Sequence, residues 1–308
     1  MEHEAVSKAV PQEAGRTPGE AKVYRPNTPE DAWKWMRTLG EGAKLSSGAT
    51  LLRYQWESGA AEMPSYLISL DSVAAMKTII VTDTELVIGA GVTLSELTLS
   101  SAVKAASPLL YTAARSVGAP SIRNMATIGG NVAWLIGDTI PALLASEASV
   151  VVWTESGRSL LLLEAWLKGR SQAPGGAVLI EKIIVPVSKQ KSELLFYQKV
   201  GRRETFTPSV VTVAASGNLD EHGCLVNLRF AAGGGATEVT RLHEVERAAE
   251  GRRPEEAVTS VYHAMVDTFD PVSDAFAPAS YRKKVAANLA ASELLKLSRR
   301  KAEWSELA

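Results

Sequence analysis

The feature that most constrains this chain is a pair of adjacent glycines in residues 126–131, which read ATIGGN. Gly129 and Gly130 carry no Cβ, so the backbone there can turn tightly and approach a ligand closely. Successive N–H groups in such a turn form a concave anion site that suits a phosphate. The short polar side chains of Thr127 and Asn131 are able to hydrogen-bond a phosphate or a sugar hydroxyl. The alternative is an ordinary loop with a Gly-Gly turn, because glycines commonly mark turns.

A longer pattern around these glycines favours the ligand-binding interpretation. Residues 121–131 read SIRNMATIGGN, and residues 138–145 read DTIPALLA. This stretch resembles the second flavin-binding loop of the FAD subunits of molybdenum hydroxylases, the medium subunits of xanthine dehydrogenase, carbon monoxide dehydrogenase and their relatives. In that family the pattern is IRN-x-[AG]-[TS]-[ILV]-GGN, followed shortly by D-x-x-P-x-L. The resemblance covers roughly residues 20–298.

An earlier loop, residues 44–51 (KLSSGATL), lies where the family has an AGG[TS][DS]L-like loop that holds the FAD pyrophosphate. Gly48 is retained. Ser47 replaces the first glycine, Ala49 the usual Thr or Ser, and Thr50 the usual Asp or Ser. Because backbone amides bind phosphate whatever the side chain, and hydroxyl side chains remain in the loop, we expect it to keep its function.

The resemblance also implies contacts outside these two loops. Val117 and Ile180 are expected to pack on the isoalloxazine or adenine ring, as apolar residues do in cofactor pockets. Asp138 is expected to bond a flavin or ribose hydroxyl, and a solvated loop carboxylate is the alternative. The FAD-contacting residues implied in all are Lys44, Leu45, Ser46, Ser47, Gly48, Ala49, Thr50, Leu51, Val117, Thr127, Ile128, Gly129, Gly130, Asn131, Asp138, Ile180, Gln198 and Lys199.

The last two of these residues belong to residues 196–203 (FYQKVGRR), which resemble the family motif Y-x-K-x-x-x-R ending at Arg203. In relatives this edge lies near the flavin, and a lysine helps to stabilise negative charge on the reduced ring. Gln198 or Lys199 is expected to take that part, depending on the register. A solvated basic face is the alternative.

Composition excludes several other classes of protein. The formal net charge of -1 lacks the basic excess of a nucleic-acid-binding chain, and no run of about 18 or more apolar residues is present to span a membrane. The histidines are scattered without metal-ligand spacing, and GxSxG, HExxH and P-loop sequences are absent. We therefore expect no catalytic side chain and no metal site, with a bound cofactor supplying the chemistry. The polar N-terminus, without a signal-peptide core, predicts a cytoplasmic protein.

Cys224 is the only cysteine, and it is expected to be a buried strand residue. An iron–sulfur cluster usually needs four thiolates, so any such cluster must be held by another chain.

A chain of 308 residues predicts two domains. Strand-like runs at 194–198, 209–219 and 224–232 predict an α+β second domain with a three-stranded antiparallel sheet and helices. The glycines at 233–235 are expected to form a flexible strand exit, because no helix start or Lys-Ser/Thr follows them. The expected parts are a flexible tail (1–20), a two-part FAD-binding domain of the vanillyl-alcohol-oxidase-like flavin fold (21–190, with subdomains about 21–75 and 76–190) and a C-terminal α+β domain (191–300).

The resemblance implies electron transfer through non-covalent FAD in a xanthine dehydrogenase-like complex. A large subunit would carry the molybdenum cofactor, a small subunit would carry [2Fe–2S] clusters, and this chain would pass electrons to NAD⁺ or another acceptor. One alternative is a stand-alone FAD oxidoreductase. Another is an assembly subunit that kept the fold but lost flavin, which only the altered residues 47–49 support. The substrate would be chosen in the molybdenum chain.

Overall fold

The computed structural model describes residues 21–172, 176–187, 192–201 and 209–306, with side chains described as far as residue 300. The predicted tail, the chain at the predicted domain boundary (188–191) and Arg203 lie outside the described residues.

The first sheet is a small parallel one with strand order β1-β3-β2. Helix α1 connects β1 to β2. Thr28 followed by proline predicts a helix start, and the structure confirms it: Thr28 Oγ1 accepts a hydrogen bond from Asp31 N at 3.0 Å, and Pro29 occupies the first helical position. Gly40, with a φ of 62°, ends the helix. The elements are β1 (Lys22–Tyr24), α1 (Pro29–Leu39), η1 (Gly40–Gly42), β2 (Ala43–Ser46), α2 (Thr50–Glu57), β3 (Tyr66–Ser69), η2 (Leu70–Ser72) and η3 (Ala74–Lys77).

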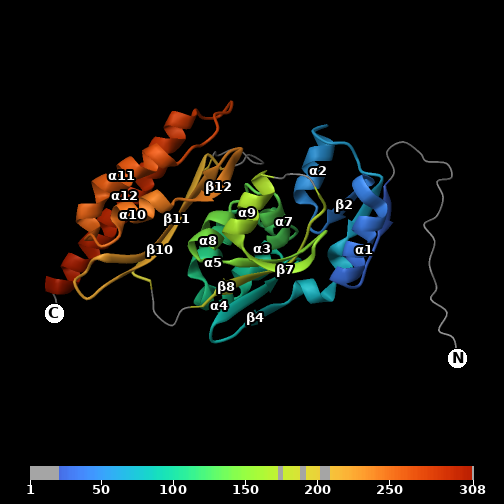
Figure 1. The fold of residues 1–308 in the computed structure, drawn as a ribbon, viewed down its shortest axis with the longest axis horizontal. Helices are drawn as coiled ribbons and strands as arrows, with labels where there is room; N and C mark the ends of the chain where they lie inside the picture. The colour runs from blue at the N-terminus through green and yellow to red at the C-terminus, as the bar shows by residue number, and fades with distance from the viewer. Residues whose placement is uncertain (1–20, 173–175, 188–191, 202–208, 307–308) are drawn as a thin grey trace.

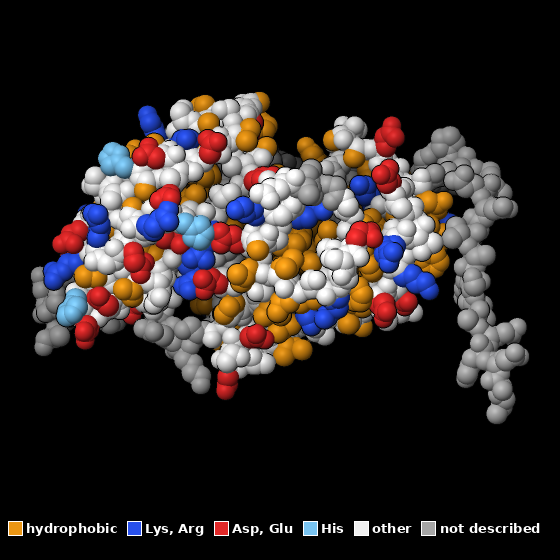
Figure 2. Space-filling view, viewed as in Figure 1, with side chains coloured by type: hydrophobic (Ala, Val, Ile, Leu, Met, Phe, Trp, Pro, Cys, Tyr) orange, Lys and Arg blue, Asp and Glu red, His pale blue; other side chains and the backbone are white. Residues whose placement is uncertain are grey.

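The second sheet has the strand order β4-β5-β8-β6-β7, and every neighbouring pair is antiparallel. One face is buried: Ile88, Ile183 and Val150 are cross-strand neighbours and none is exposed. On the other face Ile80 is 52% exposed and Leu162 is 59% exposed, and Figure 2 shows hydrophobic side chains gathered where Figure 1 places β7 and β8. The strands are β4 (Ile79–Val81), β5 (Glu85–Gly89), β6 (Ser149–Thr154), β7 (Gly157–Leu162) and β8 (Leu179–Pro186).

Short helices cover the buried face of this sheet (Figure 1). The sequence leaves Thr93 or Ser95 as the cap of the first of these helices, and the structure shows Thr93 in a capping box: Thr93 Oγ1 accepts from Glu96 N, and the Glu96 carboxylate accepts from Thr93 N. The helices are α3 (Leu94–Leu99), α4 (Ser101–Ala106), α5 (Pro108–Ser116), α6 (Pro120–Arg123), α7 (Ile128–Ala133), α8 (Ile140–Ala145) and α9 (Leu163–Gln172).

The C-terminal region contains a four-stranded antiparallel sheet in the order β12-β11-β10-β9, one strand more than the sequence predicts. Its helices cover one face, and α8 of the N-terminal region packs against the other (Figure 1). Successive side chains of β10 point to these two faces in turn. Val213 belongs to the core beneath the helices, whereas the Ser216 hydroxyl on the other face donates to Ala145 O of α8. The elements are β9 (Leu194–Val200), β10 (Val211–Leu219), β11 (Leu225–Gly234), β12 (Thr237–Arg241), α10 (His243–Ala249), α11 (Pro254–Thr268) and α12 (Ala279–Glu306).

The prediction of a flexible strand exit at residues 233–235 is wrong. Gly233 and Gly234 end β11, and Gly235 turns the chain into the unpredicted strand β12. A Cβ on Gly235 would lie 2.3 Å from a terminal nitrogen of Arg282, whose side chain is buried and donates to Val210 O. The glycines are therefore packing residues. Cys224 also differs from expectation, because it is half-buried in the turn before β11.

Candidate flavin site

The loop between β2 and α2 presents a row of open backbone donors. The N–H groups of residues 47–52 have no hydrogen-bond acceptor among the described residues. Ala49, the N-cap residue of α2, supplies no side-chain cap and has a φ of 52°. An uncapped helix start carries partial positive charge and free N–H groups, which together favour a phosphate. The backbone of this loop therefore fits a diphosphate despite the altered side chains. The positive φ angle of the loop is at Ala49 and not at Ser47, which replaces the family's first glycine.

The second loop has a different geometry from the predicted turn. Gly129 and Gly130 lie in the first turn of α7, and neither has a positive φ. The N–H groups of residues 128–131 already donate to Ala90 O, Val92 O and Thr127 oxygens at distances of 2.9 to 3.2 Å. This loop therefore offers a ligand a bare glycine surface rather than a row of free donors.

The two glycines of this loop have different structural roles. A Cβ on Gly129 would lie 2.5 Å from Ala90 Cβ and 2.7 Å from Ala90 O, so Gly129 allows α7 to pack against the end of β5. A Cβ on Gly130 would meet only Thr127 Oγ1, at 3.2 Å, and Gly130 is exposed. The open surface at Gly130 is the kind of position where a bound group can approach the backbone.

The side chains that bracket these glycines bond within the chain. Thr127 Oγ1 accepts from Gly130 N, and Asn131 Oδ1 accepts from both the N–H and the hydroxyl of Thr139, the latter at 2.6 Å. Their predicted bonds to a phosphate or a sugar stay predictions. What the structure shows is that Thr127 caps α7 and that Asn131 ties this helix to the start of α8.

Gly48 brings the two predicted loops into contact. A Cβ at this position would lie 1.7 Å from Met125 O, so only glycine permits this approach of the two backbones. The open donors of residues 47–52 and the segment that leads into α7 are therefore neighbours, although more than 70 residues separate them in the sequence. One ligand in contact with both loops fits this arrangement.

Asp138 is neither solvated nor isolated. Its carboxylate accepts from Lys199 Nζ and from Ser209 Oγ, each at 2.6 Å, and its carbonyl accepts from the Tyr197 hydroxyl at 2.9 Å. The alternative of a solvated loop carboxylate is therefore wrong, and so is that of a solvated basic face at Lys199. Contact of either residue with FAD stays a prediction. Ser209 was missed from the sequence, and Tyr197 entered only as the first residue of the Y-x-K-x-x-x-R resemblance, because nothing local to either residue points to Asp138.

The remaining predicted residues are dispersed around the loops. Lys44 is exposed in the middle of β2, whereas Leu45 and Val117 are half-buried against the N-terminal core. Ile180 is buried in that core, paired with Val152 of β6. Arg123 donates to Val117 O and Gly118 O and so holds the turn after α5. Ring packing by Val117 and Ile180 stays a prediction.

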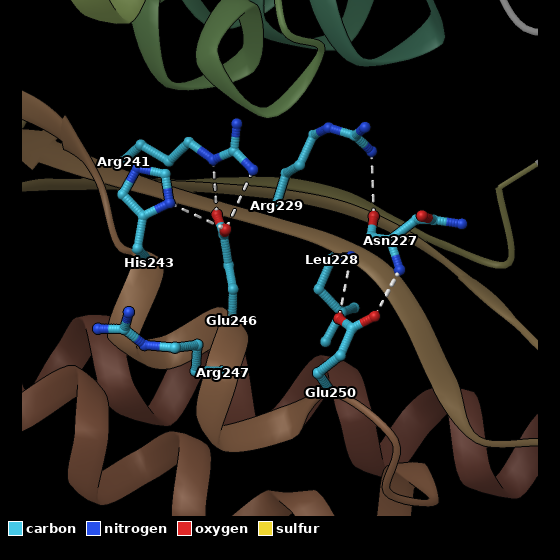
Figure 3. Close-up of a pocket in the computed structure, with 8 residues that line it drawn as sticks. All are labelled: Asn227, Leu228, Arg229, Arg241, His243, Glu246, Arg247 and Glu250. Atoms are coloured by element: carbon cyan, nitrogen blue, oxygen red, sulfur yellow. Dashed lines mark hydrogen bonds and ion pairs between the residues drawn. The ribbon is translucent and has the colours of Figure 1, made fainter.

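A pocket of about 410 Å³ in the C-terminal region contains none of these residues (Figure 3). Figure 3 shows the guanidinium groups of Arg229 and Arg241 extending from β11 and β12 toward the helices of the N-terminal region. Both pair with Glu147, which follows α8, and His243 Nε2 lies 2.6 Å from Glu164 Oε1. Glu246 also pairs with Arg241, so both guanidinium groups have carboxylate partners. The cluster joins the two regions.

This junction predicts a dependence of stability on pH. The hydrogen bond from Arg229 holds the pKa of Glu147 below its usual range, against the opposing effect of burial. A depressed pKa in the folded state contributes stability that is present above the unfolded pKa and is lost as pH falls through the folded pKa. We therefore expect Glu147→Gln to lower the melting temperature at neutral pH but to have less effect as pH falls below about 4.5. A difference in melting temperature between the variant and the wild type that stayed the same at every pH would contradict this prediction.

Residues 19–188 match the family model for the FAD binding domain in molybdopterin dehydrogenase, and residues 196–297 match the model for the CO dehydrogenase flavoprotein C-terminal domain. The chain belongs to this family of molybdopterin dehydrogenase flavoproteins. The predicted fold and family are thereby confirmed, and the family's enzymes are oxidoreductases.

Curated relatives support the same family over most of the chain. The alpha subunit of the 6-hydroxypseudooxynicotine dehydrogenase complex of Paenarthrobacter nicotinovorans is 27% identical over 87% of this chain and 90% of its own length. The carbon monoxide dehydrogenase medium chain of Hydrogenophaga pseudoflava is 27% identical over 88% of this chain and 95% of its own length. The solved carbon monoxide dehydrogenase of the latter organism, which lacks the Mo-pyranopterin moiety, has a TM-score of 0.82 at 24% identity, covering 92% of this chain and 99% of that one.

Among the described residues, no helix has the length and apolar character needed to cross a bilayer. The same residues include no group of three or more side chains suited to hold a metal ion.

Proposed function

We propose that this chain binds one FAD non-covalently and transfers electrons from [2Fe–2S] clusters of a small partner subunit to NAD⁺ or another acceptor. In this proposal a large partner subunit carries the molybdenum cofactor, and the complex is a cytoplasmic hetero-oligomer of xanthine dehydrogenase type. The observation that carries the proposal is the row of open donors at residues 47–52, packed through Gly48 against the segment leading to Gly130.

Bound FAD would supply the redox chemistry, and the protein residues would bind and orient it. The backbone of residues 47–52 would donate to the diphosphate, and the bare surface of Gly130 would let the cofactor lie close to α7. Lys199, held by Asp138 at 2.6 Å, would place a positive charge beside the site. Its ammonium group is suited to stabilise negative charge that develops nearby.

Partner subunits are supported by the relatives, one of which is named as a complex subunit and another as a medium chain. The exposed apolar face of the five-stranded sheet is consistent with a chain that another subunit covers, because monomers rarely leave large apolar patches exposed. The division into domains at about residue 190 also stays a proposal, supported by the separate sheets on either side of it.

The identity of the cofactor is directly testable. We expect acid treatment of the purified chain to release one flavin per chain with the mass of FAD rather than FMN, because two loops around a row of free donors imply a diphosphate. Denaturation should release all of the flavin, since binding is non-covalent. A colourless protein that does not take up FAD would contradict this proposal and favour the flavin-free assembly subunit.

A further inference from the structure

Strand β9 directs alternate side chains to two different neighbours, as the pleat of a strand requires. Gln198 donates to Glu293 Oε1 of α12, beneath the C-terminal helices, at 3.0 Å. Tyr197 and Lys199 point the other way and contact the N-terminal region. Of the two residues that the sequence leaves open, Lys199 therefore faces the N-terminal region and Gln198 faces α12.

Tyr197 and Lys199 each bridge the same two residues of the N-terminal region. The Tyr197 hydroxyl donates to Asp138 O at 2.9 Å and lies 3.3 Å from Ser116 Oγ. Lys199 Nζ donates to Asp138 Oδ2 at 2.6 Å and to Ser116 O at 2.9 Å. Ser209 adds a third contact from the C-terminal region to Asp138. Two side chains on one strand face therefore connect the end of α5 to Asp138, two residues before the start of α8.

Asp138 is itself predicted to touch FAD, and both it and Ser116 are linked to another predicted contact. Val117 directly follows Ser116. Thr139 follows Asp138 and bonds the side chain of Asn131, the residue after the Gly-Gly pair. A displacement of either residue would therefore move a segment of the predicted flavin site.

We propose that Tyr197 and Lys199 are positioning residues, through which the C-terminal region holds the two sides of the flavin site at a fixed separation. This inference rests on the proposed function, because it assumes that FAD occupies the loops. The Tyr197 ring is 8% exposed, among Leu109, Ala113 and neighbouring small residues. Burial, reinforced by the charge of Asp138, raises the pKa of its hydroxyl well above the ordinary value, so the group stays a donor at every working pH.

The test compares full-length holoproteins that differ in single side chains. We expect Tyr197→Phe to weaken FAD binding by about tenfold and to change the circular dichroism of the bound flavin at saturating FAD. Lys199→Met should also weaken FAD binding and change the flavin dichroism, and in addition it should shift the flavin midpoint potential. Lys199→Arg should restore part of the wild-type dichroism. Because the Tyr197 hydroxyl is already engaged by Asp138 O and Ser116 Oγ, its variant tests positioning separately from the charge that Lys199→Met removes.

A matched control removes another hydrogen bond from the same interface. Ser216 donates to Ala145 O at the far end of α8, away from Ser116 and Asp138. Ser216→Ala should lower the melting temperature about as much as Tyr197→Phe but leave the flavin dichroism and potential as in wild type. If Ser216→Ala changed them equally, or if Tyr197→Phe left affinity and dichroism unchanged, the positioning role would be overturned. A wild-type protein that binds no FAD would instead refute the proposed function.

Discussion

Gly130→Val is expected to give a folded protein that no longer retains FAD, with affinity reduced at least about a hundredfold. A valine at this position requires only a small shift of one side chain, because the only atom of the described residues that a Cβ would meet is Thr127 Oγ1 at 3.2 Å. Gly130 has an ordinary helical conformation, so no forbidden backbone angle contributes to the effect. Any loss of binding would come from branched methyl groups on the surface where the cofactor is proposed to lie. The visible spectrum and a titration with FAD measure it.

Two alanine variants extend this test, because they are expected to differ in their effect on stability. Gly130→Ala should change the free energy of unfolding of the apoprotein by less than about 1 kcal/mol, since the better helix propensity of alanine is opposed by the 3.2 Å contact of its Cβ with Thr127 Oγ1, while FAD affinity falls. Gly129→Ala should destabilise it by about 1–3 kcal/mol, because its Cβ would overlap Ala90. If Gly130→Val bound FAD with wild-type affinity and spectrum, α7 would not form part of the flavin site.

Much of this arrangement is local and could be predicted from the sequence. The cap at Thr28, the hairpins of the five-stranded sheet and the turn at residues 220–223 depend on residues close together in the chain. The second loop was found from its glycines, and the first from its resemblance to the family loop, in which Gly48 is retained. The sequence did not show that the first loop has free N–H groups and the second does not. In the second loop these groups donate to Ala90 O and Val92 O, which are distant in the sequence.

Contacts between the two regions could not be predicted. Asp138 is partnered by Tyr197, Lys199 and Ser209, residues 59 to 71 positions away, which only the docking of the C-terminal sheet on α5 and α8 brings close. The fourth strand of the C-terminal sheet was missed for a related reason. Residues 233–235 resemble a flexible linker until the buried Arg282 side chain is seen against Gly235. Burial of a charged side chain against a glycine turn leaves no periodic pattern in the sequence.

The largest functional effect is expected from the presence or absence of companion chains. A flavin that receives electrons from iron–sulfur clusters needs those clusters nearby, and the single cysteine, Cys224, cannot supply the four thiolates that a cluster usually requires. We therefore expect the isolated chain to oxidise purines or aldehydes at least about a hundredfold more slowly than a complete complex, even with FAD bound.

Addition of both companion chains should restore reduction of the flavin by substrate, whereas either companion alone should not. Rapid-mixing absorbance at the flavin band follows this step directly, and Gly130→Val provides a control in which the complex assembles without the acceptor flavin. A lone chain that turned over such substrates at the rate of the complex would establish a stand-alone oxidoreductase. In that case the acid or base would have to come from side chains outside the loops, because the N–H groups at residues 47–52 and the surface of Gly130 bind and position a cofactor but transfer no protons.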